Sequence, residues 1–521
     1  MSARRTLFRH ARVRDGRPDH AATSLAVEDG RVVFVGDDDR AAAYDGTGSG
    51  AGEVVDLHGA LLTPAFVDAH VHTVRTGFAL TGLDLTGTAS LAVTLDAVRT
   101  HADRNPGHGV LVGQGWDETG WPEGRPLELV AGGRAAPGHR CYLTRVDGHS
   151  SVVSPALAAL VPGLDGLDGW TPDGRVERDA HHAVRAVLEG LIGADERLAA
   201  ARAACRAMAG QGIAAFHENA APHIGPKDEI EVVRRAATEA GLRATVYWGE
   251  LLAVETARRL EVAGLAGDLV ADGALGSRTA ALSEPYADRP DTCGHAYVGP
   301  EQVRDHVVAC TDTGLQAGFH AIGDAALDAI GEGLEAAERV VGTTALRRAR
   351  HRLEHVEMPS RRLVETLGRL HVTASVQPMF DALWGGPDGM YAARLGERWR
   401  GTNPLRDLAA AGVRLAFGSD SPVTGLGPWA AVRAAVYHHD GAQRLRTGAA
   451  FRAHTRGGAL AARDHDGGHL GLGARADLAV WDVPGGLADD GLPDLTPGTP
   501  LPTLRRLVAA GTTIHDTQEG A

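Results

Sequence analysis

The central part of this 521-residue chain alternates between short apolar runs and amphipathic stretches. This alternation limits the folds that the chain can adopt. Amphipathic stretches typical of helices, such as 228–240, 300–313 and 324–340, lie between runs typical of strands. Strands and helices that alternate in this way form a parallel sheet, and eight such units close a barrel. We therefore predict an α/β barrel. Its eight strands are expected at 61–69, 212–216, 243–248, 268–271, 316–320, 350–354, 371–376 and 413–417.

The two ends of the chain differ from this central part. Residues 1–58 and 470–521 carry short strand-like runs separated by turn signals such as Asp29-Gly30. We predict one small β-rich domain built from both termini, antiparallel within residues 1–58, and a barrel domain over 59–469. The segment at about 91–195 does not fit the eight units, so we expect it to be an insertion that hangs over the barrel mouth.

Composition excludes several classes of protein. The net charge is −14 and no long basic run occurs, so neither nucleic acid nor an anionic membrane surface is an expected partner. No stretch of about 18 apolar residues predicts a transmembrane helix. The basic N-terminus lacks the apolar core of a signal peptide, so we expect a cytoplasmic protein. The four cysteines form no CxxC pair, which argues against a cysteine-rich zinc site.

Polar residues with metal-binding chemistry stand at the ends of four predicted strands. His70 and His72 are two residues apart, so both face the barrel interior, and His320, His355 and Asp420 end later strands. Each feature alone has an ordinary explanation, because a chain with 25 histidines contains HxH by chance and an Asp before Ser-Pro commonly starts a turn. Together, at the catalytic end of one barrel, they predict a metal site.

Further motifs accompany these residues along nearly the whole chain. They lie at 63–72, 115–117, 145–149, 271–278, 320–324, 353–355, 377–378, 418–422 and 473–482. Their order resembles the amidohydrolase superfamily of metal-dependent hydrolases, and in finer detail its amidohydrolase-3 branch, which includes proteins similar to N-substituted formamide deformylase. The resemblance implies a (β/α)8 TIM-type barrel with a small β-sandwich domain built from both termini. It does not indicate the substrate.

The fourth strand departs from the family pattern. Many members carry there a carboxylated lysine that bridges two metals, but in the register of Asp272-Gly273 this position is Asp268. The single lysine of the chain, Lys227, begins a helix elsewhere. A carboxylated-lysine bridge is therefore not expected. Asp268 is either a metal ligand or a structural carboxylate, and the chain holds one or two metals accordingly.

The resemblance implies hydrolysis by a divalent metal, which acidifies water and polarises a carbonyl. His70, His72 and His320 would hold the metal, and Asp420 would be the general base or a further ligand. His355 either completes the metal shell or binds the oxyanion. Zinc suits histidine and aspartate ligands best, with manganese, iron and cobalt as alternatives.

We expect a small-molecule substrate with a carbon–nitrogen bond that is not a peptide bond, such as an amide, formamide or cyclic amide; an ester or lactone would suit the same chemistry. The resemblance allows a homodimer. One alternative is a deaminase of a heterocyclic amidine, although Asp324 lies farther from His320 than the acid that deaminases use. Another is a non-catalytic scaffold. The residues expected to bind substrate, or else to brace loops, are Trp116, Arg145, Asp147, His149, Arg278 and Gln377.

Overall fold

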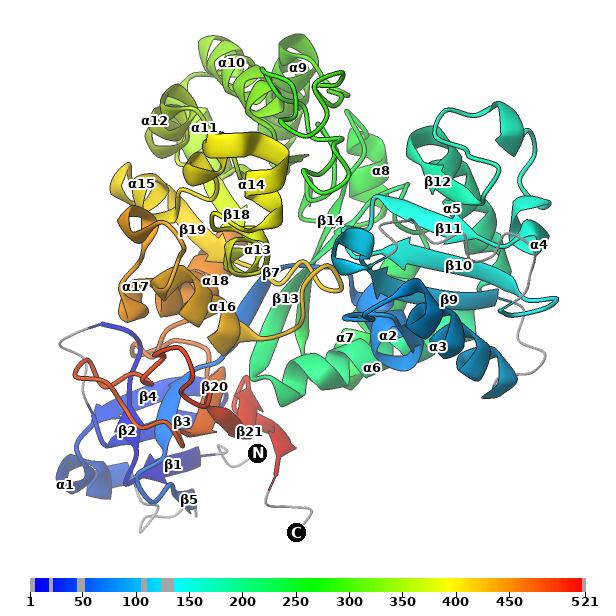
Figure 1. Ribbon diagram of the computed structural model, residues 1–521. Helices are drawn as coiled ribbons and strands as arrows, with labels where there is room; N and C mark the ends of the chain where they lie inside the picture. Colours follow the sequence, from blue (N-terminus) through cyan, green and yellow to red (C-terminus); the bar gives the residue numbers. More distant parts are fainter. Residues whose placement is uncertain (1–4, 18–21, 45–51, 105–109, 123–134, 518–521) are drawn as a thin grey trace.

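Eight parallel strands form the centre of the computed structural model, which describes residues 5–17, 22–44, 52–104, 110–122 and 135–517 (Figure 1). Their order in the sheet follows the chain, and a bridge between Val71 and Ser421 brings the first strand to the last. The predicted barrel is therefore confirmed. The strands are β7 (Phe66–Val71), β13 (Ile213–Ala220), β14 (Arg243–Trp248), β15 (Gly264–Leu265), β16 (Gln316–Ala321), β17 (Arg352–His355), β18 (Thr373–Val376) and β19 (Arg414–Phe417).

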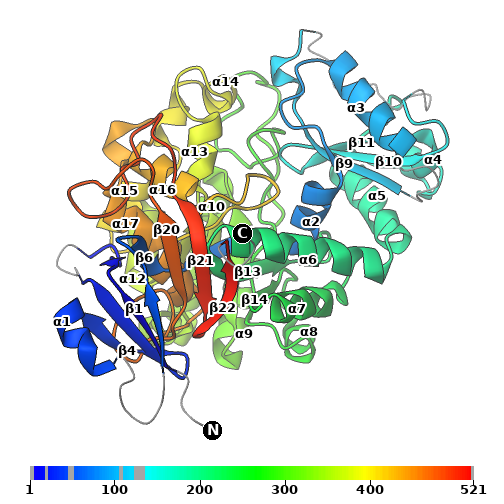
Figure 2. The same cartoon turned by 90° about the horizontal axis from the view of Figure 1, so that it is seen from below.

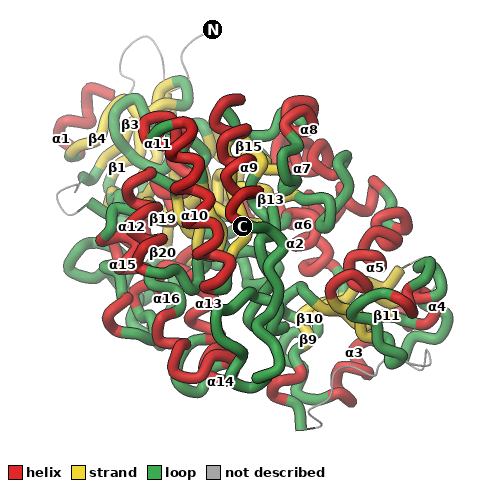
Figure 3. Tube along the Cα trace, turned by 90° about the horizontal axis from the view of Figure 1, so that it is seen from above, coloured by secondary structure: helices red, strands yellow, loops and turns green. Residues whose placement is uncertain are grey.

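Helices surround these strands, as the red and yellow tubes of Figure 3 show. In α12, Leu363, Leu367 and Leu370 recur at helical spacing and are buried in the main core, while the Ser360 side chain caps the first turn by accepting a hydrogen bond from the Leu363 amide. In the described part of the chain, no helix has the length and apolarity needed to cross a membrane. The outer helices are α6 (Ala194–Gly210), α7 (Glu229–Glu239), α8 (Val254–Arg259), α9 (Pro300–Thr313), α10 (Asp324–Val341), α11 (Thr343–Ala349), α12 (Arg361–Leu370), α13 (Pro378–Trp384), α14 (Met390–Leu395), α15 (Leu405–Ala410), α16 (Pro428–Val436), α17 (Thr447–Arg452) and α18 (Gly458–Ala461).

Segments near both ends of the chain form two smaller sheets beside the barrel (Figure 2). The prediction of a purely antiparallel unit at the N-terminus is wrong, because β1 runs parallel to β5. One sheet has the order β4-β3-β1-β5 and the other β2-β6-β20-β21-β22. The strands are β1 (Arg5–Arg9), β2 (Arg12–Val13), β3 (Ser24–Glu28), β4 (Arg31–Gly36), β5 (Glu53–Asp56), β6 (Leu61–Pro64), β20 (Leu478–Asp482), β21 (Thr503–Ala509) and β22 (Thr512–Asp516), with α1 (Asp38–Ala41) beside them.

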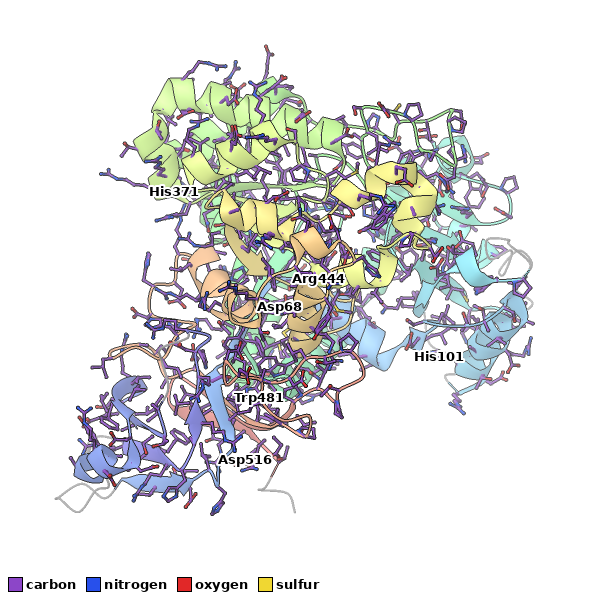
Figure 4. The ribbon with its side chains drawn as sticks, turned by 60° about the vertical axis from the view of Figure 1, so that its left-hand side comes forward. Asp68, His101, His371, Arg444, Trp481 and Asp516 are labelled. Carbon is purple, nitrogen blue, oxygen red and sulfur yellow. The ribbon has the colours of Figure 1, made fainter. Side chains whose placement is uncertain are left out.

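The run at 61–69, predicted as one barrel strand, is divided at Ala65. β6 pairs with β2 and β20 in the small sheet, and β7 then begins the barrel. The Trp481 side chain of β20, labelled in Figure 4, lies at this junction, where its indole N–H donates to the Thr63 hydroxyl at 2.9 Å and its ring contacts Phe66. The two parts of the molecule therefore share a packed interface.

A third smaller sheet lies between β7 and β13 in the chain, mostly in the insertion predicted at about 91–195, but β8 (Leu83–Asp84) precedes those bounds. Its order is β12-β11-β10-β9-β8, and it stands to one side of the barrel mouth in Figure 1. Its apolar residues form cores of their own, separate from the barrel core. The elements are α2 (Thr73–Thr81), β8 (Leu83–Asp84), α3 (Leu91–Arg104), β9 (Val110–Trp116), β10 (Arg140–Arg145), β11 (Ser150–Val153), α4 (Pro155–Ala158), β12 (Arg175–Glu177) and α5 (Arg178–Leu191).

The fourth barrel strand lies earlier in the chain than predicted. It is β15 (Gly264–Leu265) and not 268–271, of which only Val270 forms a single bridge, to His320. Gly264 allows the close approach to β16, because a Cβ there would lie 2.3 Å from the Gln316 carbonyl oxygen. The chain then turns at Gly267, whose φ is +73°. Asp268 consequently follows the strand end and lies at the barrel mouth.

Candidate metal centre

The two histidines of the HxH motif meet two carboxylates at the barrel mouth. Asp420 Oδ1 lies 3.3 Å from His70 Nε2 and 3.2 Å from His72 Nε2. Asp268 Oδ1 lies 3.4 Å from His70 Nε2, and its Oδ2 lies 3.3 Å from His72 Nε2. All four side chains are buried. Three different strand ends thus bring two imidazoles and two carboxylates to one point.

His320 and His355 complete this cluster. His355 Nε2 lies 2.9 Å from His320 Nδ1, which in turn lies 3.7 Å from Asp268 Oδ1. Three overlapping sets of side chains each place their ligand atoms within 4.8 Å of one another. These sets are His70, His355 and Asp420; His70, His72 and Asp268; and Asp268, His320 and His355. All six residues predicted as metal ligands therefore lie together, Asp268 included.

The donor set fits a divalent cation. His70 Nε2 and Asp268 Oδ1 are buried and have no hydrogen-bond partner, although buried polar atoms are normally satisfied. Imidazole nitrogen and carboxylate oxygen are ligands that suit zinc, manganese, iron and cobalt. The lone lysine takes no part, because the Lys227 amine lies 3.6 Å from a Glu250 carboxylate oxygen. No carboxylated-lysine bridge forms with this residue.

Electrostatics at the cluster favours positive charge. Burial lowers the pKa of His70, but Asp420 and Asp268 more than offset this effect and raise the pKa well above its ordinary value. The pKa of His72 rises to about 9, because Asp268 outweighs burial. Burial raises the pKa of Asp268, yet the neighbouring His72 and His70 bring it well below its ordinary value. The same field would attract a divalent cation.

A buried ion pair fixes the orientation of His70. Glu354 Oε2 accepts a hydrogen bond from His70 Nδ1 at 2.9 Å, which leaves Nε2 directed at the carboxylates. Arg352 Nε donates to Glu354 Oε1 at 2.6 Å and its Nη2 donates to Oε2 at 2.8 Å. Both charged side chains are fully buried. Sequence reasoning missed this pair, although two charged residues on one face of an apolar strand were a visible signal.

Two further carboxylates position backbone around the cluster. Asp68, labelled in Figure 4 near the centre of the barrel, accepts hydrogen bonds from the Ser419 amide at 2.9 Å and the His70 amide at 3.2 Å. It therefore ties the end of β7 to the end of β19. Glu218 Oε2 accepts from the Thr73 amide at 2.9 Å and belongs to none of the metal-binding sets.

The cluster opens into a cavity of about 230 Å³ that the barrel and the inserted segment line together. Arg145, Asp147 and His149 of the predicted substrate residues stand in its wall. The Arg145 guanidinium is held by Asp147 at 2.9 Å and by Asp117 at 2.7 Å, and it also pairs with Glu118. This residue thus braces the wall through internal ion pairs.

The other three predicted substrate residues lie outside the cavity wall. Trp116 is completely buried in the core of the inserted segment, where its indole N–H donates to a backbone carbonyl. Arg278 pairs with Asp288 through two hydrogen bonds of 3.1 and 2.6 Å. Gln377 lies behind the cluster and its Oε1 is 2.8 Å from His355 Nδ1. Gln377 therefore orients a cluster histidine.

Glu357 is a cavity residue that sequence reasoning missed. It follows His355 by two positions, is buried, and accepts a hydrogen bond from the Tyr391 hydroxyl at 2.5 Å. Burial raises its pKa to about 7. Asp324, weighed above as a deaminase acid, instead accepts a hydrogen bond from the Ser283 amide at 3.0 Å and is not part of the cavity wall.

The model of the amidohydrolase family matches residues 53–495, which contain the whole cluster. The chain belongs to the amidohydrolase family. The resemblance expected from the motifs is therefore confirmed, and family membership supports a hydrolase that acts on carbon–nitrogen bonds.

Three curated relatives align with this chain over most of their length. It is 26% identical over 511 residues to Protein LONG AFTER FAR-RED 3 of Arabidopsis thaliana, covering 88% of this chain and 85% of the plant protein. It is 28% identical over 450 residues to Putative amidohydrolase YtcJ of Bacillus subtilis (strain 168), covering 79% and 80%. It is 23% identical over 510 residues to N-substituted formamide deformylase of Arthrobacter pascens, covering 88% and 90%.

The fold of this amidohydrolase is also found among solved structures. An uncharacterized metal-dependent hydrolase from Pyrococcus horikoshii OT3 matches with a TM-score of 0.74 at 24% identity. The match covers 92% of this chain and 97% of the other. This likeness supports the barrel and its additional sheets.

Proposed function

We propose that this amidohydrolase is a metal-dependent hydrolase that cleaves a carbon–nitrogen bond other than a peptide bond, in a small amide, formamide or cyclic amide. The cluster of four histidines and two aspartates at the barrel mouth carries this proposal. The names of two relatives, Putative amidohydrolase YtcJ and N-substituted formamide deformylase, support it.

The residues of the cluster divide between holding a cation and moving a proton. His70, His72, His320 and Asp268 would hold the cation, with zinc as our first choice. A bound divalent cation lowers the pKa of water and polarises a carbonyl group. Asp420 Oδ1 stands between the two histidines of the HxH motif, where it can accept a proton from the attacking water and pass it to the leaving nitrogen.

His355 and His149 would have different roles in this reaction. His355 donates its Nδ1–H to Gln377, so its Nε2 lone pair is directed at the cluster as a further ligand. The centroid of the His149 ring lies 5.8 Å from that of His320, and both residues line the cavity. Burial lowers the pKa of His149 to about 4, so the ring is neutral and can donate one N–H to the substrate carbonyl.

The alternative functions have less support from the site. A deaminase requires an acid beside His320, and Asp324 does not fill that place. A scaffold without catalysis would be expected to lose ligands, yet every predicted ligand lies in the cluster. We therefore retain hydrolysis of a carbon–nitrogen bond as the proposed activity.

Metal content and turnover together test this proposal. We expect one or two divalent ions per chain by plasma mass spectrometry after purification without chelator, and fewer in Asp268→Ala. The protein should release amine and acid, formate included, from a panel of amides and N-substituted formamides, or should open the ring of cyclic amides, and Asp420→Asn is the matched inactive control. A chain that stays metal-free when zinc or manganese is added would overturn the proposal.

A further inference from the structure

The cavity extends from the metal centre to a second group of charged residues. Arg75 of α2 and Arg185 of α5 both line it. Arg75 Nη2 donates to the Ile224 carbonyl at 2.5 Å, and Arg185 Nη1 donates to the neighbouring His223 carbonyl at 3.3 Å. Two adjacent carbonyls of one loop thus bring two guanidinium groups to the same end of the cavity.

In the described part of the chain, the hydrogen-bond partners of Arg185 are neutral. Its Nε donates to the Tyr142 hydroxyl at 3.0 Å and its Nη2 donates to the Gly148 carbonyl at 2.8 Å, in addition to the His223 contact. These three bonds use three of the five N–H groups of a guanidinium. Among the residues that the structure describes, no carboxylate lies within 4.0 Å of this cation. A half-buried cation without a carboxylate is costly unless an anion comes to it.

The surroundings of Arg185 do not neutralise its charge. Burial lowers the pKa of His223 well below its ordinary value, and Arg185 lowers it further, so this imidazole is neutral. Burial would raise the pKa of Tyr142, but Arg185 and Arg75 more than offset the effect and lower it. Arg197 of α6 also stands in this wall, and its Nη2 lies 3.8 Å from Asp228 Oδ2. Among the described residues, the groups that Arg185 contacts at this end of the cavity are therefore neutral.

Two consecutive residues of the cavity wall connect the surroundings of Arg185 with the metal centre. The Gly148 carbonyl that binds Arg185 belongs to the residue before His149, and the His149 ring lies 5.8 Å from the His320 ring. Arg185 and the cluster histidines therefore line one continuous cavity, on either side of Gly148 and His149.

We propose that the substrate carries a carboxylate that pairs with Arg185 while its scissile carbon–nitrogen bond lies at the metal centre. The two remaining N–H groups of Arg185 match the two oxygens of a carboxylate. The second half of this inference rests on the proposed function, whereas carboxylate binding by Arg185 does not. The inserted segment, which supplies Arg185, would then select acidic substrates in a protein that is itself strongly acidic.

Binding measured without turnover tests the inference. The zinc-loaded Asp420→Asn protein is titrated by calorimetry with N-formylglycine and N-formylphenylalanine, and with the primary amide of each. We expect the carboxylates to bind roughly 10- to 100-fold more tightly than the amides, as for a hydrogen-bonded charge pair. Adding Arg185→Gln should remove this preference and leave the affinity for the amides unchanged.

Two more variants keep the outcome clear. Arg202→Gln, on an exposed ion pair with Glu239, should leave the preference intact. If Arg185→Gln unfolds, Arg185→Lys serves in its place, because it keeps the charge, loses the paired N–H geometry and should lose part of the preference. Equal affinity for carboxylate and amide, including no binding of either, overturns the inference, and so does a preference that survives both Arg185 variants.

Measuring binding preference and hydrolysis separately distinguishes a failure of this inference from a failure of the proposed function. Carboxylate preference without any hydrolysis would count against the proposed function alone. Hydrolysis of neutral amides without carboxylate preference would count against the role of Arg185 alone.

Discussion

Replacing Glu354 by Gln should weaken both the fold and the metal centre. The substitution keeps the size of the side chain but removes the charge that Arg352 and His70 share. Arg352 would then remain buried without a carboxylate, which typically costs about 3–5 kcal/mol. An amide NH2, which donates, would replace one of the two oxygens that accept from Arg352 and His70.

The structure gives an independent magnitude for this loss. Burial raises the pKa of Glu354, but Arg352 and His70 outweigh it and lower the pKa from 4.5 to about 2. That difference corresponds to about 3 kcal/mol of stability at neutral pH. Because the pKa is lowered in the folded state, this stability is present above pH 4.5 and is lost as the pH falls toward 2. The difference in the free energy of unfolding between the wild type and Glu354→Gln should therefore decrease over the same pH range.

Urea unfolding and metal competition measure the two effects. We expect Glu354→Gln to lower the free energy of unfolding by about 3 kcal/mol and to lower metal affinity by roughly 10- to 100-fold against a chelator. Glu365→Gln breaks an exposed pair with Arg361 and is the matched control, with an expected loss below about 0.5 kcal/mol. A Glu354→Gln protein as stable as this control would refute the reasoning.

Other changes should produce distinct results. Asp420→Asn should reduce turnover by about 100- to 10,000-fold while most of the metal is retained, and near-normal turnover would remove Asp420 from its proposed role. Replacing His70 and His72 together by Ala should abolish metal retention after dialysis, as measured by plasma mass spectrometry; full occupancy would contradict the ligand assignment. Gly77→Ala should destabilise the protein by about 1–3 kcal/mol in urea, because a Cβ there would lie 1.9 Å from the Ala200 carbonyl oxygen; unchanged stability would show that the helices separate freely.

The barrel and most of the cluster were predictable because both follow from position along a strand. His70 and His320 lie at the ends of apolar runs, His355 ends the next strand, and the ends of parallel strands meet at one edge. Asp268 was harder to place because β15 is only two residues long, too short for a pattern of alternation. Its position depends on the turn at Gly267 and on pairing with β16, which are properties of the folded chain.

The substrate residues were less predictable for a related reason. Trp116 ends the buried strand β9, and no local pattern distinguishes a core tryptophan from a cavity wall. Arg278 finds its partner in Asp288, an internal ion pair that spacing alone does not indicate. Arg185 lies on a helix whose sequence gives no sign that one of its faces lines the cavity.

Because the first apolar run is divided at Ala65, its first half, β6, cannot complete its sheet until late in synthesis. β6 leads directly into β7, which carries His70, yet one of the two neighbours of β6 in its sheet is β20, more than 400 residues later. A nascent chain therefore exposes one edge of β6 until nearly the whole sequence has left the ribosome. The first metal-binding strand receives its final anchor only when the last part of the chain arrives.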